Sequence, residues 1–312
     1  MATTHPQAAP RPAPSSPGRR ERAHRPSGAG YLFVAPFLVL FLAVFVVPLL
    51  YAAYLSLFRE QLVGGTVFAG LDNYTRALGD DRLVGGIWRV GRFFLVQVPV
   101  MLGLALLAAL AIDSGLLRFS KVFRLGIFVP YAVPSVVATL MWGYLYGREF
   151  GPFGQLAHAV GLPKPDFLDP HVVLASMANI VTWEFTGYNM IILYAALRAI
   201  PTDLYEAAAV DGAGAWRVAW SIKIPALRPA LLLCLIFSVI GSFQLFAEPQ
   251  LLQRLVPSVI DSAYTPNLYA YTLAFTGQEV NYAAAVSFLL GLVIVVASST
   301  VLLLTSRGSR TR

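Results

Sequence analysis

The chain has 312 residues, of which 57% are hydrophobic and 12% are charged, and its mean hydropathy is +0.66. A soluble domain carries about 25% charged residues, so this composition excludes an ordinary soluble fold and predicts a chain embedded in lipid. The net charge of +7 does not indicate nucleic-acid binding, because the basic residues fall in short loops and at the two ends. The single cysteine, Cys234, excludes a disulfide framework and a cysteine metal site.

The first segment, residues 1–27, is rich in proline, arginine, serine and alanine. Such a composition offers too little apolar surface to build a core. The apolar run that follows is too long for a signal peptide, and no small-residue cleavage site closes it. We therefore predict a disordered basic cytoplasmic tail over 1–27, followed by one transmembrane domain over 28–312.

Six apolar segments follow the tail, each close to or above the roughly 20 residues that a helix needs to cross the hydrocarbon of a bilayer. Prolines interrupt several of them, which membrane helices tolerate because neighbouring groups satisfy the freed carbonyls. The predicted fold class is an all-α integral membrane protein with six spans. The approximate bounds of the spans are 31–58, 93–112, 125–146, 172–197, 229–246 and 282–304.

The orientation follows from the distribution of lysine and arginine. Fifteen of the 23 basic residues lie in the N-terminal tail, the C-terminal tail and the loops 113–124 and 198–228, and eight lie on the other side. Basic residues concentrate on the cytoplasmic side of a membrane. We therefore expect a multi-pass protein of the bacterial plasma membrane with both termini in the cytoplasm.

The loop over 198–228 is more than a connector. Pro201, Thr202 and Asp203 are typical of a helix start, and the alanine-rich stretch after them has high helix propensity. Gly212 predicts a C-cap or sharp turn, and a second helix is expected to follow it as far as Pro225. The pattern predicts two short helices folded at a glycine on the cytosolic side.

This loop resembles the EAA loop of the permeases of ATP-binding-cassette (ABC) importers, and we call residues 198–228 the EAA loop. The matching motif is Glu-Ala-Ala at 206–208, glycine at 212 and Ile-Lys-Ile-Pro at 222–225, with isoleucine at 224 where leucine is usual. The resemblance implies a six-helix, MetI-like bundle and coupling helices that sit in a cleft of an ATPase subunit, the glutamate pairing a basic residue there. The residues implied in ATPase coupling are Glu206, Ala207, Ala208, Asp211, Gly212, Ile222 and Pro225.

Another interpretation of Glu206 stays open. Asp203 and Glu206 have the spacing of a capping box, in which the glutamate bonds to the backbone at the start of its own helix. Asp211 likewise fits either a contact with a partner or a role in the fold of the loop.

Two further segments, 68–74 and 186–190, resemble the carbohydrate branch of the family, which contains the maltose and glycerol-phosphate permeases. The 68–74 segment and the basic tail are more similar to the first of the two permeases in such systems. The resemblance implies three kinds of partner: a second permease, two ATP-binding-cassette subunits and an extracytoplasmic solute-binding lipoprotein.

The sequence itself offers no catalytic or cofactor site. It has no G-x-x-x-x-G-K-[ST] loop that could cradle ATP phosphates, and its four histidines lie in the tail and loops without ligand spacing. We expect a chain that is not an enzyme and binds no metal or cofactor, with ATP and Mg²⁺ used by partner subunits.

A sugar path should be lined by polar and aromatic side chains inside otherwise apolar spans. The candidates are Trp183, Glu184, Thr186, Tyr188 and Asn189 in the fourth span, and Ser242, Phe243 and Gln244 in the fifth. Glu184 is expected roughly 18 Å into its span, near the midplane, where an ionisable group is a functional candidate. It could instead pair with another helix or lie shallower. Ser242 and Gln244 face different sides of a helix, so helix packing is an alternative for them.

Two features are expected on the outer side. The loop over 261–281 could meet a binding protein, although it departs from the Gly-Gly-Pro stretch usual in the family. Trp142, Tyr144 and Tyr146 are typical of anchors at the membrane interface.

The expected function is that of a permease subunit that translocates a mono-, di- or oligosaccharide inward by alternating access. Three alternatives remain. The same type of importer could carry a polyamine, a phosphonate or glycerol phosphate. An ion-coupled secondary transporter would need several intramembrane charges, where the spans hold Glu184 alone. A membrane scaffold would need no polar path.

Overall fold

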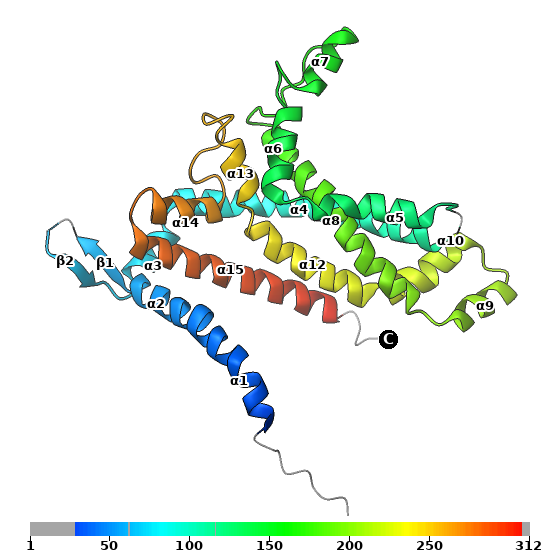
Figure 1. The fold of residues 1–312 in the computed structure, drawn as a ribbon, viewed down its shortest axis with the longest axis horizontal. Coiled ribbons are helices and arrows are strands. Elements are labelled where there is room, and N and C mark those ends of the chain that lie inside the picture. The colour runs from blue at the N-terminus through cyan, green and yellow to red at the C-terminus, as the bar shows by residue number, and fades with distance from the viewer. Residues whose placement is uncertain (1–28, 62, 116, 308–312) are drawn as a thin grey trace, which may run out of the picture. The chain divides into compact units, whose positions relative to one another are not determined.

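The computed structural model of the chain describes residues 29–61, 63–115 and 117–307 (Figure 1). It divides into two compact units, residues 1–50 and 51–312. The predicted disordered tail over 1–27 lies outside the described residues.

The described part of the first unit, residues 29–50, is helical. It holds α1 (Ala29–Phe41), the π-helical η1 (Leu42–Val46) and the start of α2 (Val47–Ser56). Within η1 the backbone N–H of Val47 donates to the carbonyl of Leu42, one residue further back than in an α-helix. Pro48 follows, and because proline has no N–H, the wider turn lies where the regular ladder is already interrupted.

A small hairpin follows α2 in the second unit. Strands β1 (Phe58–Gln61) and β2 (Gly65–Phe68) pair antiparallel, with Phe58 opposite Phe68. Gly64 and Gly65 both have positive φ in the turn, a conformation that costs glycine little. The hairpin is an addition to the predicted helical fold, and the predicted end of the first span at residue 58 was wrong, because Phe58 already belongs to a strand.

Helices α3 (Asp72–Leu78) and α4 (Asp81–Asp113) come next. The amide of Asn73 in α3 donates to the carbonyls of Ser56 and Phe58, both at 2.8 Å, and so ties α3 to the base of the hairpin. The 33 residues of α4 extend the second predicted span toward the N-terminus by three turns.

The third predicted span is broken. Helix α5 (Ser120–Phe128) runs into the 3-10 helix η2 (Val129–Ala132), and α6 (Ser135–Leu145) then leaves at an angle of 97°. Pro134 accounts for the break, because the residue before it, Val133, is extended with φ −79° and ψ 127°, while Pro130 lies in the first turn of η2, where its missing N–H is tolerated. Helix α7 (Pro152–Ala159) follows.

The fourth predicted span is α8 (Val173–Arg198), which leads into the EAA loop. The loop contains α9 (Thr202–Val210), α10 (Ala215–Val218), the π-helical η3 (Ala219–Lys223) and α11 (Ile224–Ala226). The predicted turn is confirmed: Gly212 has φ +69°, and the chain reverses there between α9 and α10.

The remaining helices are α12 (Arg228–Phe243), α13 (Ala247–Leu252), α14 (Pro266–Phe275) and α15 (Val280–Arg307). In this second unit α14 packs on α15, α12 packs on both α4 and α15, and α4 packs along α8. Figure 1 shows α9 and α10 at one end of these long helices, with α3 and the hairpin at the other.

Four segments in the described part of the chain are long and apolar enough to cross a membrane: Leu32–Ser56, Asp81–Asp113, Arg228–Leu252 and Val280–Leu303. The bent pair α5–α6 is a fifth if it counts as one span. Helix α8 has 26 residues and is longer than three of these four segments. It is not among them, because its middle carries the polar cluster around Glu184 and Asn189.

An apolar cluster joins α4, α8 and α12. It contains Ala109 and Ile112 of α4, Leu193 and Leu197 of α8, and Cys234 of α12. Gly187 allows α8 to come close to α5, because a Cβ at this position would overlap the carbonyl oxygen of Ile127.

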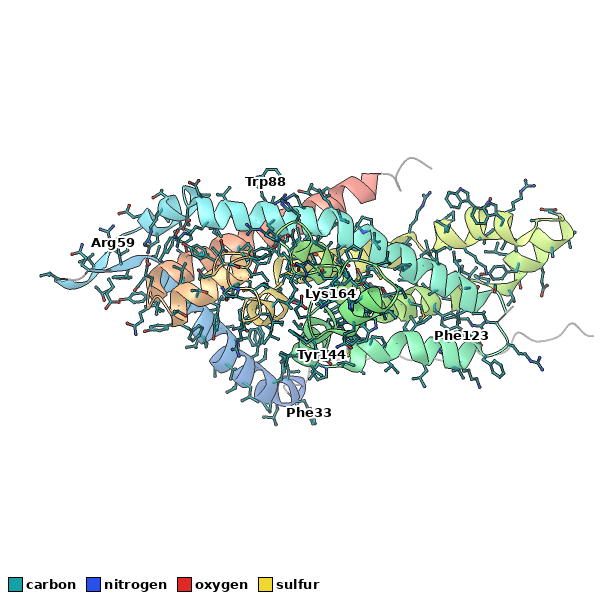
Figure 2. All side chains as sticks on the ribbon, turned by 90° about the horizontal axis from the view of Figure 1, so that it is seen from above. Phe33, Arg59, Trp88, Phe123, Tyr144 and Lys164 are labelled. Carbon is teal, nitrogen blue, oxygen red and sulfur yellow. The ribbon has the colours of Figure 1, made fainter. Side chains whose placement is uncertain are left out.

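Many large apolar side chains remain exposed on the second unit. Figure 2 shows Trp88 on α4 and Phe123 on α5 projecting outward, with 71% and 50% of their surface exposed. An outward apolar surface on this scale is what a helix bundle presents to lipid.

Candidate functional site

A cavity of about 490 Å³ opens between α4, α8, α12 and the segment after α12. Its wall combines aromatic rings with amides, hydroxyls and one carboxylate. The lining residues used below are Phe93, Gln97 and Met101 of α4, Phe185, Tyr188 and Asn189 of α8, and Phe237, Ser242, Gln244, Phe246, Glu248 and Asn267.

The structure brings four of the eight predicted path residues together. Tyr188, Asn189, Ser242 and Gln244 line the cavity. The other four, Trp183, Glu184, Thr186 and Phe243, are not part of its wall. Ser242 and Gln244 both contribute because α12 ends at Phe243, so the helical spacing that separates them does not extend to Gln244.

Sequence reasoning missed the contribution of α4. Gln97 is a polar residue in the middle of an apolar span, and this was a usable signal. Its amide nitrogen lies 3.4 Å from the Thr182 hydroxyl and 3.3 Å from the sulfur of Met101. Gln97 is thus held against α8 while its side chain borders the cavity.

The amides in the wall are oriented by the protein. The side-chain nitrogen of Asn189 donates to the carbonyl of Phe185 at 3.0 Å, and that of Asn267 donates to the carbonyl of Gln244 at 3.2 Å. With their N–H groups engaged, the two amides have carbonyl oxygens that can accept hydroxyl hydrogen bonds. The ring of Tyr188 is stacked on Tyr131, with centroids 4.7 Å apart.

Two carboxyl groups are buried in this region. Glu248, in α13, is part of the cavity wall. Glu184, in α8, is 4% exposed, and its Oε2 atom has no hydrogen-bond partner among the described residues. The carboxyl group that borders the cavity is therefore the one that follows the broken end of α12, rather than the one in the middle of α8.

The EAA loop presents most of its motif outward. Glu206, Ala207, Asp211 and Gly212 are exposed, Ala208 is buried, and Ile222 and Pro225 are half-buried. The capping-box interpretation of Glu206 is wrong, because the N-cap of α9 is Pro201 and no side chain bonds at that cap. The Glu206 carboxylate is thus not engaged at the start of its helix.

An apolar surface lies beside the motif. Trp216 and Trp220 stack with centroids 6.0 Å apart and remain 79% and 63% exposed, and Val210 at the end of α9 is also exposed. Exposed apolar groups beside a carboxylate that has no ion-pair partner in the described part of the chain are typical of a protein–protein contact.

A polar cluster braces the opposite end of α4. Asp80, the N-cap of α4, accepts hydrogen bonds from the hydroxyls of Tyr269 and Tyr282, both at 2.7 Å. The guanidinium of Arg76 lies 3.8 Å from the ring centroid of Tyr282 and pairs with Glu279 at 2.8 Å. We call these five residues the Asp80 cluster.

The charge of Asp80 is stabilised by its neighbours. Burial acts to raise the pKa of Asp80, but the hydrogen bonds from the two tyrosines and from the backbone outweigh it and leave the pKa below its ordinary value. Burial and the hydrogen bond to Asp80 raise the pKa of Tyr269 to about 12. The cluster is therefore a charged acceptor with neutral donors around neutral pH.

Residues 99–307 match the family described as the binding-protein-dependent transport system inner membrane component. The match covers the cavity-lining parts of α8 and α12, the EAA loop and α15. The chain belongs to this family, and it is an integral, multi-pass inner-membrane protein.

Relatives at moderate identity extend over nearly the whole chain. The permease protein AraP of the arabinooligosaccharides transport system of Bacillus subtilis is 30% identical over 284 residues, covering 90% of each chain. The lactose transport permease LacF of Rhizobium radiobacter is 33% identical over 275 residues, covering 86% of this chain and 91% of the relative.

The fold is that of a solved transporter. A chain of a bacterial ABC transporter that imports the acidic polysaccharide alginate superimposes with a TM-score of 0.77 at 19% identity, covering 89% of this chain and 95% of the other. The same transporter in complex with an alginate-bound periplasmic protein gives 0.76 at 19% identity. This chain is a membrane permease subunit of a binding-protein-dependent ABC importer, and it is not the catalytic subunit.

Proposed function

We propose that this permease translocates a neutral sugar inward by alternating access, and that the polar cavity is the sugar path. The observation that carries the proposal is the composition of the cavity wall. It offers amides, hydroxyls and aromatic rings, and the described lining residues include neither lysine nor arginine. Hydroxyl-rich ligands bind amide and carboxylate acceptors through their O–H groups and aromatic faces through their C–H groups.

The same wall bears on the alternatives. Glycerol phosphate and phosphonates are anions, and a wall whose described residues include an acidic side chain and no basic one disfavours them. A polyamine would be attracted by the Glu248 carboxylate, so it is the competing substrate that an experiment has to separate from a sugar.

The energy is supplied by other chains. Two ATP-binding-cassette subunits use ATP and Mg²⁺, and the EAA loop of this chain and that of a second permease each contact one of them. A solute-binding lipoprotein delivers the sugar from outside, and both termini of the chain lie in the cytoplasm. The exposed Glu206 and the apolar surface beside it support this assignment.

The substrate is tested by the ATPase rate of the complete complex in proteoliposomes, with its binding protein. The panel contains an arabinose oligosaccharide, lactose, diacetylchitobiose, glycerol 3-phosphate and spermidine. We expect at least one saccharide to raise the rate several-fold. Stimulation by spermidine or glycerol 3-phosphate alone would contradict the proposal.

The role of the cavity is tested by a matched pair of variants. Glu248→Gln removes the carboxylate that borders the cavity, and Glu184→Gln removes a buried carboxylate outside its wall. We expect Glu248→Gln to change the saccharide concentration for half-maximal ATPase stimulation more than Glu184→Gln does. A larger change in Glu184→Gln than in Glu248→Gln would indicate that the sugar path runs near Glu184 rather than near Glu248.

A further inference from the structure

A buried ion pair joins the EAA loop to α4. The ammonium of Lys223 lies 2.6 Å from a carboxylate oxygen of Asp113, and the two side chains are 14% and 9% exposed. Asp113 is the last residue of α4, and Lys223 is the last residue of η3. The two residues are 110 positions apart in the sequence, so tertiary structure alone brings them together.

Helix α9 contributes a third group. The Lys223 ammonium lies 5.5 Å from the ring centroid of Tyr205, whose hydroxyl is buried and has no hydrogen-bond partner among the described residues. Burial and the nearby Asp113 carboxylate raise the pKa of Tyr205, while Arg198 lowers it. Both short helical segments of the EAA loop therefore meet the end of α4 at this point.

The pair differs in kind from the contacts around it. The neighbouring cluster of α4, α8 and α12 is apolar, and apolar contacts are non-directional. Among the described residues, Lys223–Asp113 is the only ion pair that connects the EAA loop to a long helix of the bundle. A buried charge pair is sensitive to distance, because separating it leaves charges without compensation.

Helix α4 leads from this pair to the cavity. Gln97 and Met101, on the same helix, line the cavity, and Gln97 precedes Asp113 by 16 residues (113 minus 97). At 1.5 Å per residue the separation is roughly 24 Å of helix. A displacement applied at Asp113 can therefore reach the wall of the cavity through one continuous element.

We propose that Asp113 and Lys223 are positioning residues that link the EAA loop to α4, so that movement of the loop displaces the cavity wall. The inference rests on the proposed function, in which ATPase subunits move the EAA loop. Without the pair, the loop would still be connected to α12 through the backbone, because η3, α11 and α12 follow one another directly. The pair adds a direct polar link from the loop to α4, which also packs on α8 and α12.

The test follows the cavity wall rather than transport. A Cys234→Ala background removes the native thiol, and Gln97→Cys places a single thiol on α4 in the cavity. The labelling rate of this thiol by a negatively charged methanethiosulfonate reagent is measured in the complete complex, without nucleotide and after trapping with ATP and vanadate. We expect the two rates to differ by about tenfold in this parent.

Asp113→Asn and Lys223→Gln are expected to reduce that difference to less than about twofold, while ATPase subunits still co-purify and trap nucleotide. The charge-swapped variant Asp113→Lys with Lys223→Asp should recover most of it. Lys121→Gln, which removes an exposed lysine at the start of α5, is the matched control and should behave like the parent.

Three results would overturn the inference. The first is an unchanged nucleotide dependence in Asp113→Asn or Lys223→Gln. The second is a charge-swapped variant that assembles and traps nucleotide without recovering the difference, and the third is an equal loss in Lys121→Gln. If the parent itself shows no difference, or no ATPase subunit co-purifies with it, the proposed function fails first and the inference falls with it.

Discussion

The two ends of α4 are held in different ways. At its start, the Asp80 cluster joins α3, α4, α14 and α15 through two hydrogen bonds to one carboxylate, a cation–π contact and an ion pair. At its end, α4 packs on α8 and α12 in an apolar cluster, and the described residues show one ion pair from it to the EAA loop. The first end is held by a polar network with several connections, and the second by non-directional apolar packing together with one polar contact to the loop.

This difference indicates where the helix bundle can change shape. A satisfied polar network that connects four elements resists separation of any one of them. A single pair can shift as a unit with the loop that carries it. We therefore expect the Asp80 end to determine stability and the EAA end to determine coupling, and variants at the two ends should affect different measurements.

The largest effect is expected for Glu206→Lys in the EAA loop. The exposed carboxylate is replaced by a charge that repels the basic residue implied on the ATPase subunit. ATP-driven uptake should fall to the level of protein-free vesicles, with the thermal unfolding of the permease unchanged. Asp203→Lys, an exposed acid in the same helix, is the control and should retain most uptake. Normal uptake by Glu206→Lys would defeat the coupling assignment.

Asp80→Ala should have the largest effect on stability. The substitution leaves the hydroxyls of Tyr269 and Tyr282 without their acceptor, which costs about 3 kcal/mol for two hydrogen bonds to a charged group. The loss is measured as a lower midpoint of thermal unfolding in detergent. Asp81→Ala changes the exposed neighbour and should cost much less. Equal effects of the two variants would show that the network is not a brace.

The pH dependence of the free energy of unfolding should reflect the titration of groups in the Asp80 cluster. The pKa of Tyr269 is raised from 10.0 to about 12 in the folded protein, so its stabilising contribution is complete below pH 10 and is lost as the pH rises toward 12. The pKa of Asp80 is lowered, so its contribution is complete above about pH 4 and is lost at more acidic pH. The alkaline loss, followed by thermal unfolding between pH 9 and 12, should be smaller in Tyr269→Phe. An equal alkaline loss of stability in the unmodified protein and in Tyr269→Phe would mean that groups other than Tyr269 cause it.

The smallest effect is expected for Glu279→Gln. The side chains of Arg76 and Glu279 are 51% and 44% exposed, and an exposed ion pair contributes about 1 kcal/mol or less. Because salt screens exposed charges, any loss in the unfolding midpoint should vanish at high ionic strength. A loss as large as that of Asp80→Ala would mean that the ion pair, rather than the shared carboxylate, holds the cluster together.

The bundle itself was predictable to a large extent. Apolar runs longer than the hydrocarbon thickness located α4, α12 and α15, and the glycine, proline and alanine pattern predicted the two-part EAA loop that turns at Gly212. These predictions succeed because lipid requires every backbone polar group to be satisfied within the segment, which makes a helix the local solution. The hairpin at 58–68 was missed, because strand pairing depends on a partner segment that periodicity does not reveal.

The site was only partly predictable. Polar residues in apolar helices pointed to Tyr188, Asn189, Ser242 and Gln244, and the cavity contains all four. Glu184 fitted the same rule but lies outside the wall, since a single sequence does not reveal which side of a helix faces the cavity. Glu248 is part of the cavity wall because α12 ends at Phe243 and the short helix α13, which follows it, places the Glu248 side chain there.

By itself, the sequence of this protein determined that the chain lies in a membrane, where most of its helices run and which loop carries the EAA motif, because each of these depends on short-range composition and spacing. Tertiary structure alone decided the 97° break between α5 and α6, the cavity wall, the shared carboxylate of Asp80 and the pairing of Asp113 with Lys223. These features join residues far apart in the chain, and their partners are selected by the packing of helices rather than by any local pattern.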